Sequence, residues 1–146
     1  MDVFSRTFLP AAAEAGVTIP TVSRHIPILR RCVAPDDSAV LVGRCVSPEH
    51  PRSGDFLLLL TYRRLVVTNE TRVLHRPRLH LDADLQDLRN VTWRTDLHGP
   101  AVELAATAVD GRRERLRIRL TEPGQGWRVD SLLDQLFGGG TAARAA

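Results

Sequence analysis

The longest apolar runs of the chain lie between Phe56 and Thr68, where the sequence is FLLLLTYRRLVVT. Five apolar residues come first, and a second apolar run begins at Leu65 after the basic pair Arg63 and Arg64. Continuous apolar runs are typical of strands that are buried on both faces, and the basic break between them is typical of a turn. The pattern predicts that this stretch forms the central hairpin of an all-β core.

Further strands are expected around this hairpin, because short apolar runs and alternating positions are separated by turn residues. The predicted strands cover residues 39–47, 55–61, 65–68, 72–76 and 88–95. Pro77 follows the fourth of them, and proline cannot donate a hydrogen bond to a neighbouring strand. We therefore expect that strand to end there or to lie at an edge of the sheet.

The last hairpin can be placed in register from its side chains. Val102 and Leu104 alternate with other residues on one strand, and Leu116 and Ile118 do so on the next. Cross-strand partners share a face of the sheet, so the connecting loop must have an odd number of residues. A loop over residues 109–111 places its final glycine at the left-handed position that such loops prefer. Leu104 is then expected opposite Leu116, and Val102 opposite Ile118.

The first 34 residues have a helical pattern that is interrupted by prolines. Pro10 can open a short helix that Gly16 closes, and a second helical patch runs from Thr21 to Ile26. Pro27 should end that patch and begin another, because proline breaks the interior of a helix.

The C-terminal part predicts one amphipathic helix from Val129 to Phe137, where apolar residues recur at helical spacing before three glycines. The expected organisation is a helical lead-in over residues 1–34, a β-domain with this helix over 35–138, and a flexible tail over 139–146.

The composition indicates a folded protein in the cytoplasm. The 146 residues are 43% hydrophobic and carry a formal net charge of +3, and all 20 basic residues are arginine. The chain opens without a secretory apolar segment, and no apolar run approaches the roughly 20 residues of a membrane helix. Cys32 and Cys45 are therefore expected to be reduced and to pack as small apolar side chains.

The phrase Leu60 to Thr68, LTYRRLVVT, resembles the hairpin of bacterial PH-like domains, which are related to GRAM domains. The resemblance covers roughly residues 26–137, including the final helix. It implies a mainly β fold, in which two antiparallel sheets form a partly open barrel that a C-terminal helix plugs, preceded here by a short helical segment. It also implies a binding module.

In eukaryotic relatives of that family, the loop between the first two strands binds phosphoinositides through basic residues. This chain has Arg44, His50 and Arg52 around that loop, so the resemblance makes them a possible loop site. The second strand begins with Asp55 followed by apolar residues, where the lipid-binding pattern has a basic pair.

A second resemblance concerns residues 13–26, AEAGVTIPTVSRHI, which are similar to the helix-turn-helix of LacI-type repressors. By that resemblance Thr21, Ser23 and Arg24 would face the major groove of DNA. A DNA-binding regulator that uses residues 10–26 is therefore an alternative function. The simpler interpretation is a helical lead-in that packs Val22 and Ile26 on the barrel.

A basic strand provides the main candidate site. Strand alternation places Arg113, Arg115, Arg117 and Arg119 on one face, and Arg112 precedes them in the hairpin turn. The row is either a solvated strand face or a docking surface for an anionic partner. We expect a protein partner, with an anionic membrane at the inner face of the cell membrane as the leading special case and nucleic acid as the alternative.

No catalytic motif stands out. No phrase resembles a nucleophile elbow or a glycine-rich phosphate loop, and His75 and His80 lack further ligands at metal-site spacing. The expected protein is a non-enzymatic adaptor without catalytic residues, metal or cofactor, and an enzyme of unknown type remains the second alternative.

Overall fold

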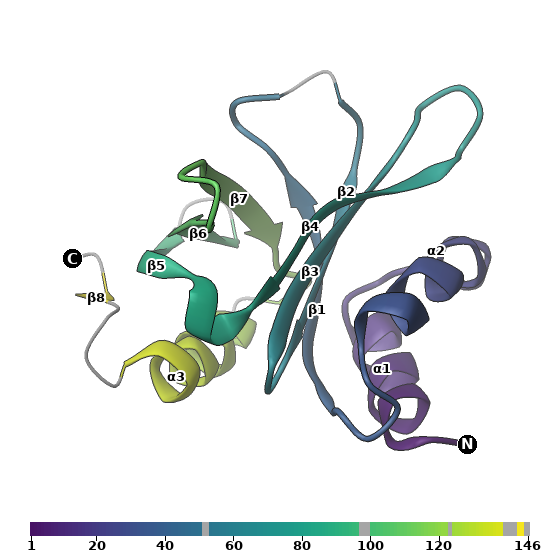
Figure 1. Ribbon diagram of the computed structural model, residues 1–146, viewed down its shortest axis with the longest axis horizontal. Coiled ribbons are helices and arrows are strands. Elements are labelled where there is room, and N and C mark those ends of the chain that lie inside the picture. Colours follow the sequence, from purple (N-terminus) through teal and green to yellow (C-terminus); the bar gives the residue numbers. More distant parts are fainter. Residues whose placement is uncertain (51–52, 97–99, 123, 139–142, 145–146) are drawn as a thin grey trace.

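The computed structural model of the protein describes residues 1–50, 53–96, 100–122, 124–138 and 143–144 (Figure 1). Two helices come first, α1 (Val3–Glu14) and α2 (Ile19–Cys32). The strands are β1 (Ala39–Val46), β2 (Phe56–Thr61), β3 (Arg64–Glu70), β4 (Pro77–Asp84), β5 (Arg89–Asp96), β6 (Ala101–Thr107), β7 (Arg113–Arg119) and the short β8 (Ala143–Arg144). A 3-10 turn (Leu85–Asp87) precedes β5, and helix α3 (Gln125–Phe137) follows β7.

The strands follow the order β4-β3-β2-β1-β7-β6-β5-β8, and β1 to β7 pair antiparallel. Among the described strands, the half β1–β4 and the half β5–β7 pair only where Cys45 and Val46 of β1 meet Ile118 and Arg117 of β7. No pairing between β4 and β5 is present in the described chain, so the barrel stays open. The architecture predicted from the sequence, a two-sheet, partly open barrel plugged by a C-terminal helix after a helical segment, is confirmed.

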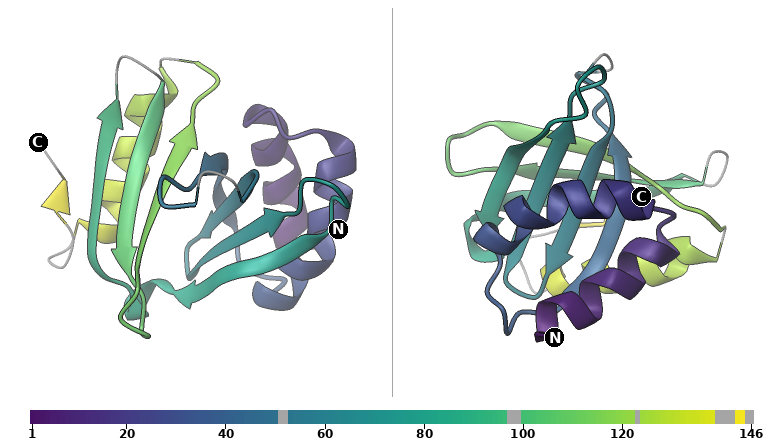
Figure 2. Two further views of the ribbon diagram at one scale, coloured as in Figure 1. Left: turned by 90° about the horizontal axis from the view of Figure 1, so that it is seen from above. Right: turned by 90° about the vertical axis from the view of Figure 1, so that its right-hand side faces the viewer.

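Strand β2 is buried along its whole length because both of its faces are covered. Phe56, Leu58 and Leu60 pack in the core between the two halves of the barrel. Leu57 and Leu59 point to the other face, where α1 and α2 pack over the sheet. Figure 2 shows these two helices on the outer side of β1–β4, opposite the half β5–β7. The double coverage explains why this strand has no alternation of apolar and polar residues.

The two N-terminal helices are longer than predicted and contain the prolines inside. Helix α1 begins at Val3 after Asp2, whose carboxylate accepts a hydrogen bond from the Ser5 N–H at 2.8 Å. Pro10 lies within α1 and Pro27 within α2, so the predicted helix boundaries at these residues are wrong. Both prolines are exposed, as are the residues four positions earlier whose carbonyls lose a donor. Burial of the opposite helix faces on the sheet outweighs the lost hydrogen bonds.

The predicted register of the β6–β7 hairpin is confirmed. Leu104 pairs with Leu116 and Val102 with Ile118. The Ala108 N–H donates to the Arg112 carbonyl at 2.9 Å, which closes a three-residue loop. Gly111 has a φ of +85°, the left-handed conformation that this loop requires of its last residue.

The predicted strand over residues 72–76 is wrong. Strand β3 continues to Glu70, and β4 begins at Pro77. The intervening residues form a hairpin tip, where the Thr71 N–H donates to the Arg76 carbonyl at 3.1 Å. Proline is tolerated as the first residue of a strand, so Pro77 starts the strand that it was expected to end.

Helix α3 covers one open end of the barrel. Val129, Leu133 and Phe137 are buried in the core between the sheets. The indole N–H of Trp93 on β5 donates to the Asp130 carboxylate at 3.0 Å, which fixes the helix to the second half of the barrel. Of the predicted tail, only 143–144 are described, as β8 parallel to β5; its other residues lie outside the described chain.

Removing one buried side chain of α3 should destabilise the whole barrel. Leu133 is fully buried, so Leu133→Ala should lower the free energy of unfolding by about 2–5 kcal/mol in urea denaturation. The exposed Gln135 lies on the same helix, and Gln135→Ala should change the stability by less than about 0.5 kcal/mol. Equal effects of the two substitutions would show that α3 does not plug the core.

Candidate functional site

The arginine row of β7 is less uniform than its sequence spacing indicates. Arg117 is half-buried and forms ion pairs with Asp96 at 2.8 Å and with Glu103 at 3.2 Å. The hydrogen bond to Asp96 raises the pKa of its guanidinium. Arg117 is therefore part of the sheet's own ion-pair network and not a free docking group, contrary to the expectation that it faces water.

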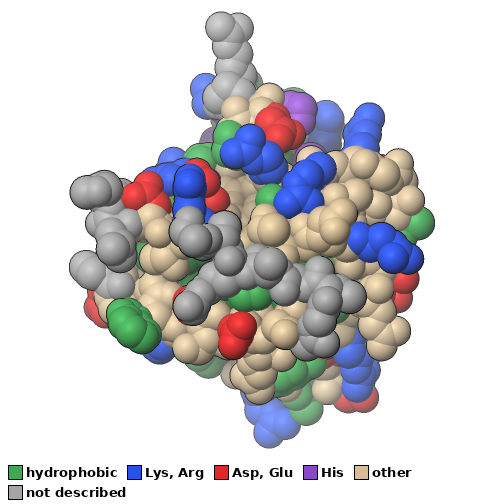
Figure 3. All heavy atoms as spheres, turned by 90° about the vertical axis from the view of Figure 1, so that its left-hand side faces the viewer, with side chains coloured by type: hydrophobic (Ala, Val, Ile, Leu, Met, Phe, Trp, Pro, Cys, Tyr) green, Lys and Arg blue, Asp and Glu red, His purple; other side chains and the backbone are tan. Residues whose placement is uncertain are grey.

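The other arginines of the row divide into two kinds. Arg113 donates to the Asn90 carbonyl and to the Thr92 and Thr107 hydroxyls, at distances of 2.9–3.1 Å. Within the described part of the chain, the exposed Arg112, Arg115 and Arg119 have no ion pair. These three therefore remain available to an anionic partner. Figure 3 shows that basic and acidic side chains lie interspersed on the side of the molecule it presents.

The possible loop site is described only in part. Arg44 is exposed on β1 and approaches the carboxylate of Asp55 to 3.8 Å. His50 is exposed in the β1–β2 loop, in a turn where its N–H donates to the Ser47 carbonyl. Arg52 lies outside the described residues.

A buried polar cluster links α2 to the first half of the barrel. His25 is buried, and its Nδ1 lies 2.7 Å from the Thr68 hydroxyl on β3. Its Nε2 lies 3.9 Å from the Glu70 carboxylate. A pocket of about 140 Å³ lies here, with Arg44 and Asp55 also in its lining. No pattern in the sequence predicts this cluster, because its members come from separate elements.

Two of the three residues proposed to contact DNA, Thr21 and Arg24, form hydrogen bonds within the protein. Arg24 donates to the Glu70 carboxylate on β3 and to the Thr21 hydroxyl. Ser23 is exposed, whereas Val22 is buried on the sheet. Helix α2 is thus a cover of the sheet and not a free-standing recognition helix, which disfavours the DNA-binding alternative.

Two exposed apolar residues lie among arginines at the β3–β4 hairpin tip. Val73 is 87% exposed and Leu74 is 66% exposed. They line an open groove of about 440 Å³ together with Arg72, Arg76 and Arg78. In the described chain, no carboxylate pairs with Arg76 or Arg78. In the sequence, Val73 and Leu74 stand between two arginines, which is a pattern typical of an exposed binding site. The strand predicted over residues 72–76 implied that these apolar residues were buried, so the site was not predicted.

Hydrogen bonds hold the base of the β3–β4 hairpin tip against the β1–β2 connection. The Asn69 side-chain amide donates to the carbonyls of Ser53 at 2.7 Å and Asp55 at 3.3 Å, which joins the β1–β2 connection to β3. Gly54 has a φ of +84°, and a Cβ there would lie 2.9 Å from the Glu70 carbonyl oxygen. Two hairpin ends are therefore held side by side, and Figures 1 and 2 show them projecting together from one end of the molecule.

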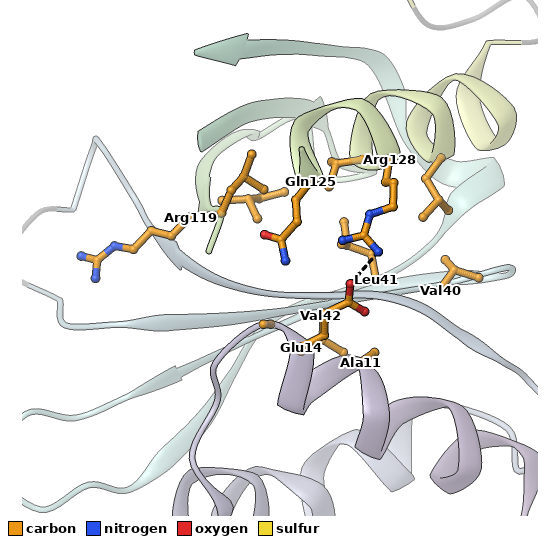
Figure 4. A pocket seen from close by; sticks show the side chains of 13 residues that line it. Ala11, Glu14, Val40, Leu41, Val42, Arg119, Gln125 and Arg128 are labelled. Carbon is orange, nitrogen blue, oxygen red and sulfur yellow. Dashed lines mark ion pairs between the residues drawn. The ribbon is translucent and has the colours of Figure 1, made fainter. Parts of the chain in front are cut away.

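A second cavity lies between helices α1 and α3 (Figure 4). It has a volume of about 130 Å³, and its walls come mainly from apolar residues of α1, β1, β7 and α3. Glu14 of α1 and Arg128 of α3 point toward each other across it and form an ion pair at 2.6 Å. Arg119 lies at its edge, with the guanidinium directed away from the apolar walls.

The two histidines considered as metal ligands contact different carboxylates and do not form a shared site. His80 Nε2 lies 3.0 Å from the Glu114 carboxylate, and the ring meets Phe56 edge-on at 5.0 Å, so the pair bridges β4 and β7. His75 is exposed at the hairpin tip, 4.0 Å from Glu70. Among the described residues, no group of three or more His, Cys, Asp and Glu side chains is arranged to hold a metal. No helix in the same residues combines the length and apolar composition needed to cross a membrane.

No family model and no curated protein matches the sequence. Among solved structures, the hSac2 domain from human phosphoinositide phosphatase Sac2 is similar with a TM-score of 0.56 and 14% identity, over 86% of this chain and 87% of that chain. A pleckstrin homology domain from Shewanella amazonensis has a TM-score of 0.49 and 12% identity, over 83% of this chain and 98% of that chain. The strand order, the α3 plug and the likeness to the hSac2 domain show a PH-like fold.

Protonation of the buried histidine should weaken the attachment of α2. Burial lowers the pKa of His25 below its ordinary value of 6.5; Glu70 opposes this shift and Arg24 adds to it. As the pH falls through 6.5, His25 takes up a proton more readily in the unfolded chain than in the folded chain. Proton binding therefore favours the unfolded chain, and the free energy of unfolding should fall as the pH drops through and below that value.

Urea denaturation at neutral and mildly acidic pH measures this loss. His25→Asn keeps a polar atom for Thr68 but cannot titrate, so this variant should lose less stability on acidification than the natural chain. Equal losses in the two proteins would show that other groups cause the pH dependence.

Proposed function

We propose that the chain is a non-enzymatic binding module that docks on an anionic membrane surface through the tip of the β3–β4 hairpin. The observation that carries this proposal is the exposed pair Val73 and Leu74, which stands among Arg72, Arg76 and Arg78 at a projecting end of the barrel. Exposed apolar side chains flanked by arginine suit the boundary between lipid headgroups and acyl chains.

The two parts of the tip act on different regions of the membrane. Val73 and Leu74 enter the interface, where burial of apolar surface is favourable. The guanidinium groups bind headgroup phosphates, and each arginine near an anionic leaflet contributes about 1 kcal/mol. A single weak attachment is reversible, so the combination of apolar insertion and charge is what gives useful affinity.

The arginine row supports a second candidate function, docking on an anionic protein. Arg112 and Arg115 are exposed and, in the described chain, have no ion pair, while Arg119 marks the other end of the strand. This surface lies on a flat strand face and has no exposed apolar pair within the row itself. It therefore suits acidic side chains of a protein better than insertion into lipid.

Charge removal at the tip should separate the two candidates. We expect Arg76→Ser with Arg78→Ser to weaken co-sedimentation with vesicles of phosphatidylcholine and phosphatidylserine by about thirtyfold, which corresponds to about 1 kcal/mol per arginine. The loss should be largest at low ionic strength, where screening is least. The matched control is Arg112→Ser with Arg115→Ser, which removes the same charge from the β7 row and its turn.

Each outcome of this comparison has a consequence. Weakening by the tip pair alone supports the proposed membrane site. Equal weakening by both pairs shows that only total charge matters, and weakening by the control pair alone transfers the site to the arginine row. No vesicle binding by the natural chain at low salt would refute the membrane proposal.

The apolar part of the tip has its own test. Val73→Ser with Leu74→Ser should reduce vesicle binding at high salt as well as at low salt, because insertion of apolar side chains is not screened. Val109→Ser alters an apolar residue of the β6–β7 turn that is also strongly exposed, and it should leave binding unchanged. If the tip variant bound as tightly as the natural chain at every salt concentration, the tip would act only through its charge.

A further inference from the structure

The cavity between α1 and α3 marks the place where the two halves of the barrel part. Strands β1 and β7 pair only at Cys45–Ile118 and Val46–Arg117, and beyond this point they diverge. The side chain of Ile118 comes so close to Gly43 that a Cβ there would lie 2.6 Å from it. The strands are thus pinned at one end, and the groove opens beside residues 40–42 of β1.

The groove has the size of one apolar side chain. Its volume is about 130 Å³, and a cavity of about 150 Å³ is large enough for benzene. Ala11 and Ala15 form the α1 side, and their small side chains leave the space open. Leu41 and Leu132 lie among the apolar groups that line the rest.

The rim of the groove carries an exposed ion pair whose carboxylate can be replaced by that of a ligand. Glu14 and Arg128 bridge it, and their side chains are 54% and 61% exposed. Ion pairs between such exposed groups stabilise a fold very little, so another carboxylate can replace Glu14 on Arg128. Arg119 at the edge directs its guanidinium away from the apolar walls and has no ion pair in the described chain, so it can meet an acidic side chain that lies beyond the groove.

The edge of β1 along the groove provides backbone groups. Over residues 40–42, β1 pairs with β2 on one side, and no described strand pairs with its other side. An open strand edge is a surface on which an extended peptide can add hydrogen bonds. The groove combines an apolar pocket, Arg128 and a strand edge, and Arg119 stands just beyond it. An extended acidic segment can use all four features, whereas a free fatty acid cannot pair with a strand edge.

We infer that this groove binds an extended segment of a partner protein, which seats one apolar side chain between α1 and α3 and places neighbouring acidic side chains on Arg128 and Arg119. The groove and the hairpin tip are formed by different residues and share none of them. The protein can therefore hold a partner segment while the tip docks elsewhere, and this inference does not depend on the membrane proposal.

The probe is a random peptide library displayed on phage and selected on the natural chain. Selected peptides should contain an apolar residue with Asp or Glu beside it. Arg128→Gln should weaken their binding about tenfold, as expected for loss of a charged hydrogen bond. Glu14→Gln should have the opposite effect and tighten binding up to about fivefold, because it removes the carboxylate that competes for Arg128.

The opposite effects of Arg128→Gln and Glu14→Gln on peptide binding distinguish a binding groove from a purely structural ion pair. If the pair were only structural, either substitution would lower the stability of the protein and neither would tighten peptide binding. Ala11→Leu fills the groove without touching the charges and should abolish binding, and the tip variant Arg76→Ser with Arg78→Ser should retain it. Thermal unfolding of each variant shows whether it is folded. No selected peptides, peptides without acidic residues, or equal binding by the filled-groove variant would overturn the inference.

Discussion

The burial of β2 on both faces is the constraint on which the rest of the structure depends. Its alternate side chains enter two separate apolar clusters, one inside the barrel and one beneath the N-terminal helices. Without α1 and α2, Leu57 and Leu59 would form part of a large apolar patch exposed to water, which favours aggregation. The two helices therefore belong to the same folded unit as the barrel. Helix α2 is held by Leu29 and His25, and its Arg24 is drawn to Glu70 of β3. A sequence similar to a DNA-recognition helix is thereby committed to covering a sheet.

This coverage decides where the protein can bind anything else. The outer face of β1–β4 is occupied by two helices, and one mouth of the barrel is occupied by α3. The surfaces that remain include the hairpin tips, the outer face of β5–β7, the pocket beside His25 and the groove between α1 and α3. On the outer face, Glu103 pairs with both Arg94 and Arg117, so much of that charge is neutralised within the sheet. Among the described residues, Arg76 and Arg78 at the tip, Arg112 in the β6–β7 turn and Arg119 beside the groove have no ion pair.

The sequence predicts those features that depend on neighbouring residues along the chain. The pairing of Leu104 with Leu116 follows from alternation and loop parity alone, and the α3 stripe follows from helical spacing. The prolines were misjudged because Pro10 and Pro27 stand on exposed helix faces, which only the packing of the opposite faces reveals. The strength of the Arg117 network was also hidden, since Asp96 reaches it from β5, two strands away. The His25 cluster and the groove combine residues far apart in sequence, which no local pattern brings together.

The arrangement of charge gives the two proposed surfaces different physical characters. At the hairpin tip, arginines surround apolar side chains that are exposed already, so binding there buries apolar surface that is in contact with water. At the groove, Arg128 already has Glu14, and a ligand must compete for it. The first surface is governed by screening and apolar burial, and the second by exchange of one carboxylate for another. An anionic membrane offers many equivalent phosphates to the first, whereas only a segment with the right order of apolar and acidic residues satisfies the second. If both proposals hold, specificity resides in the groove and general attraction in the tip.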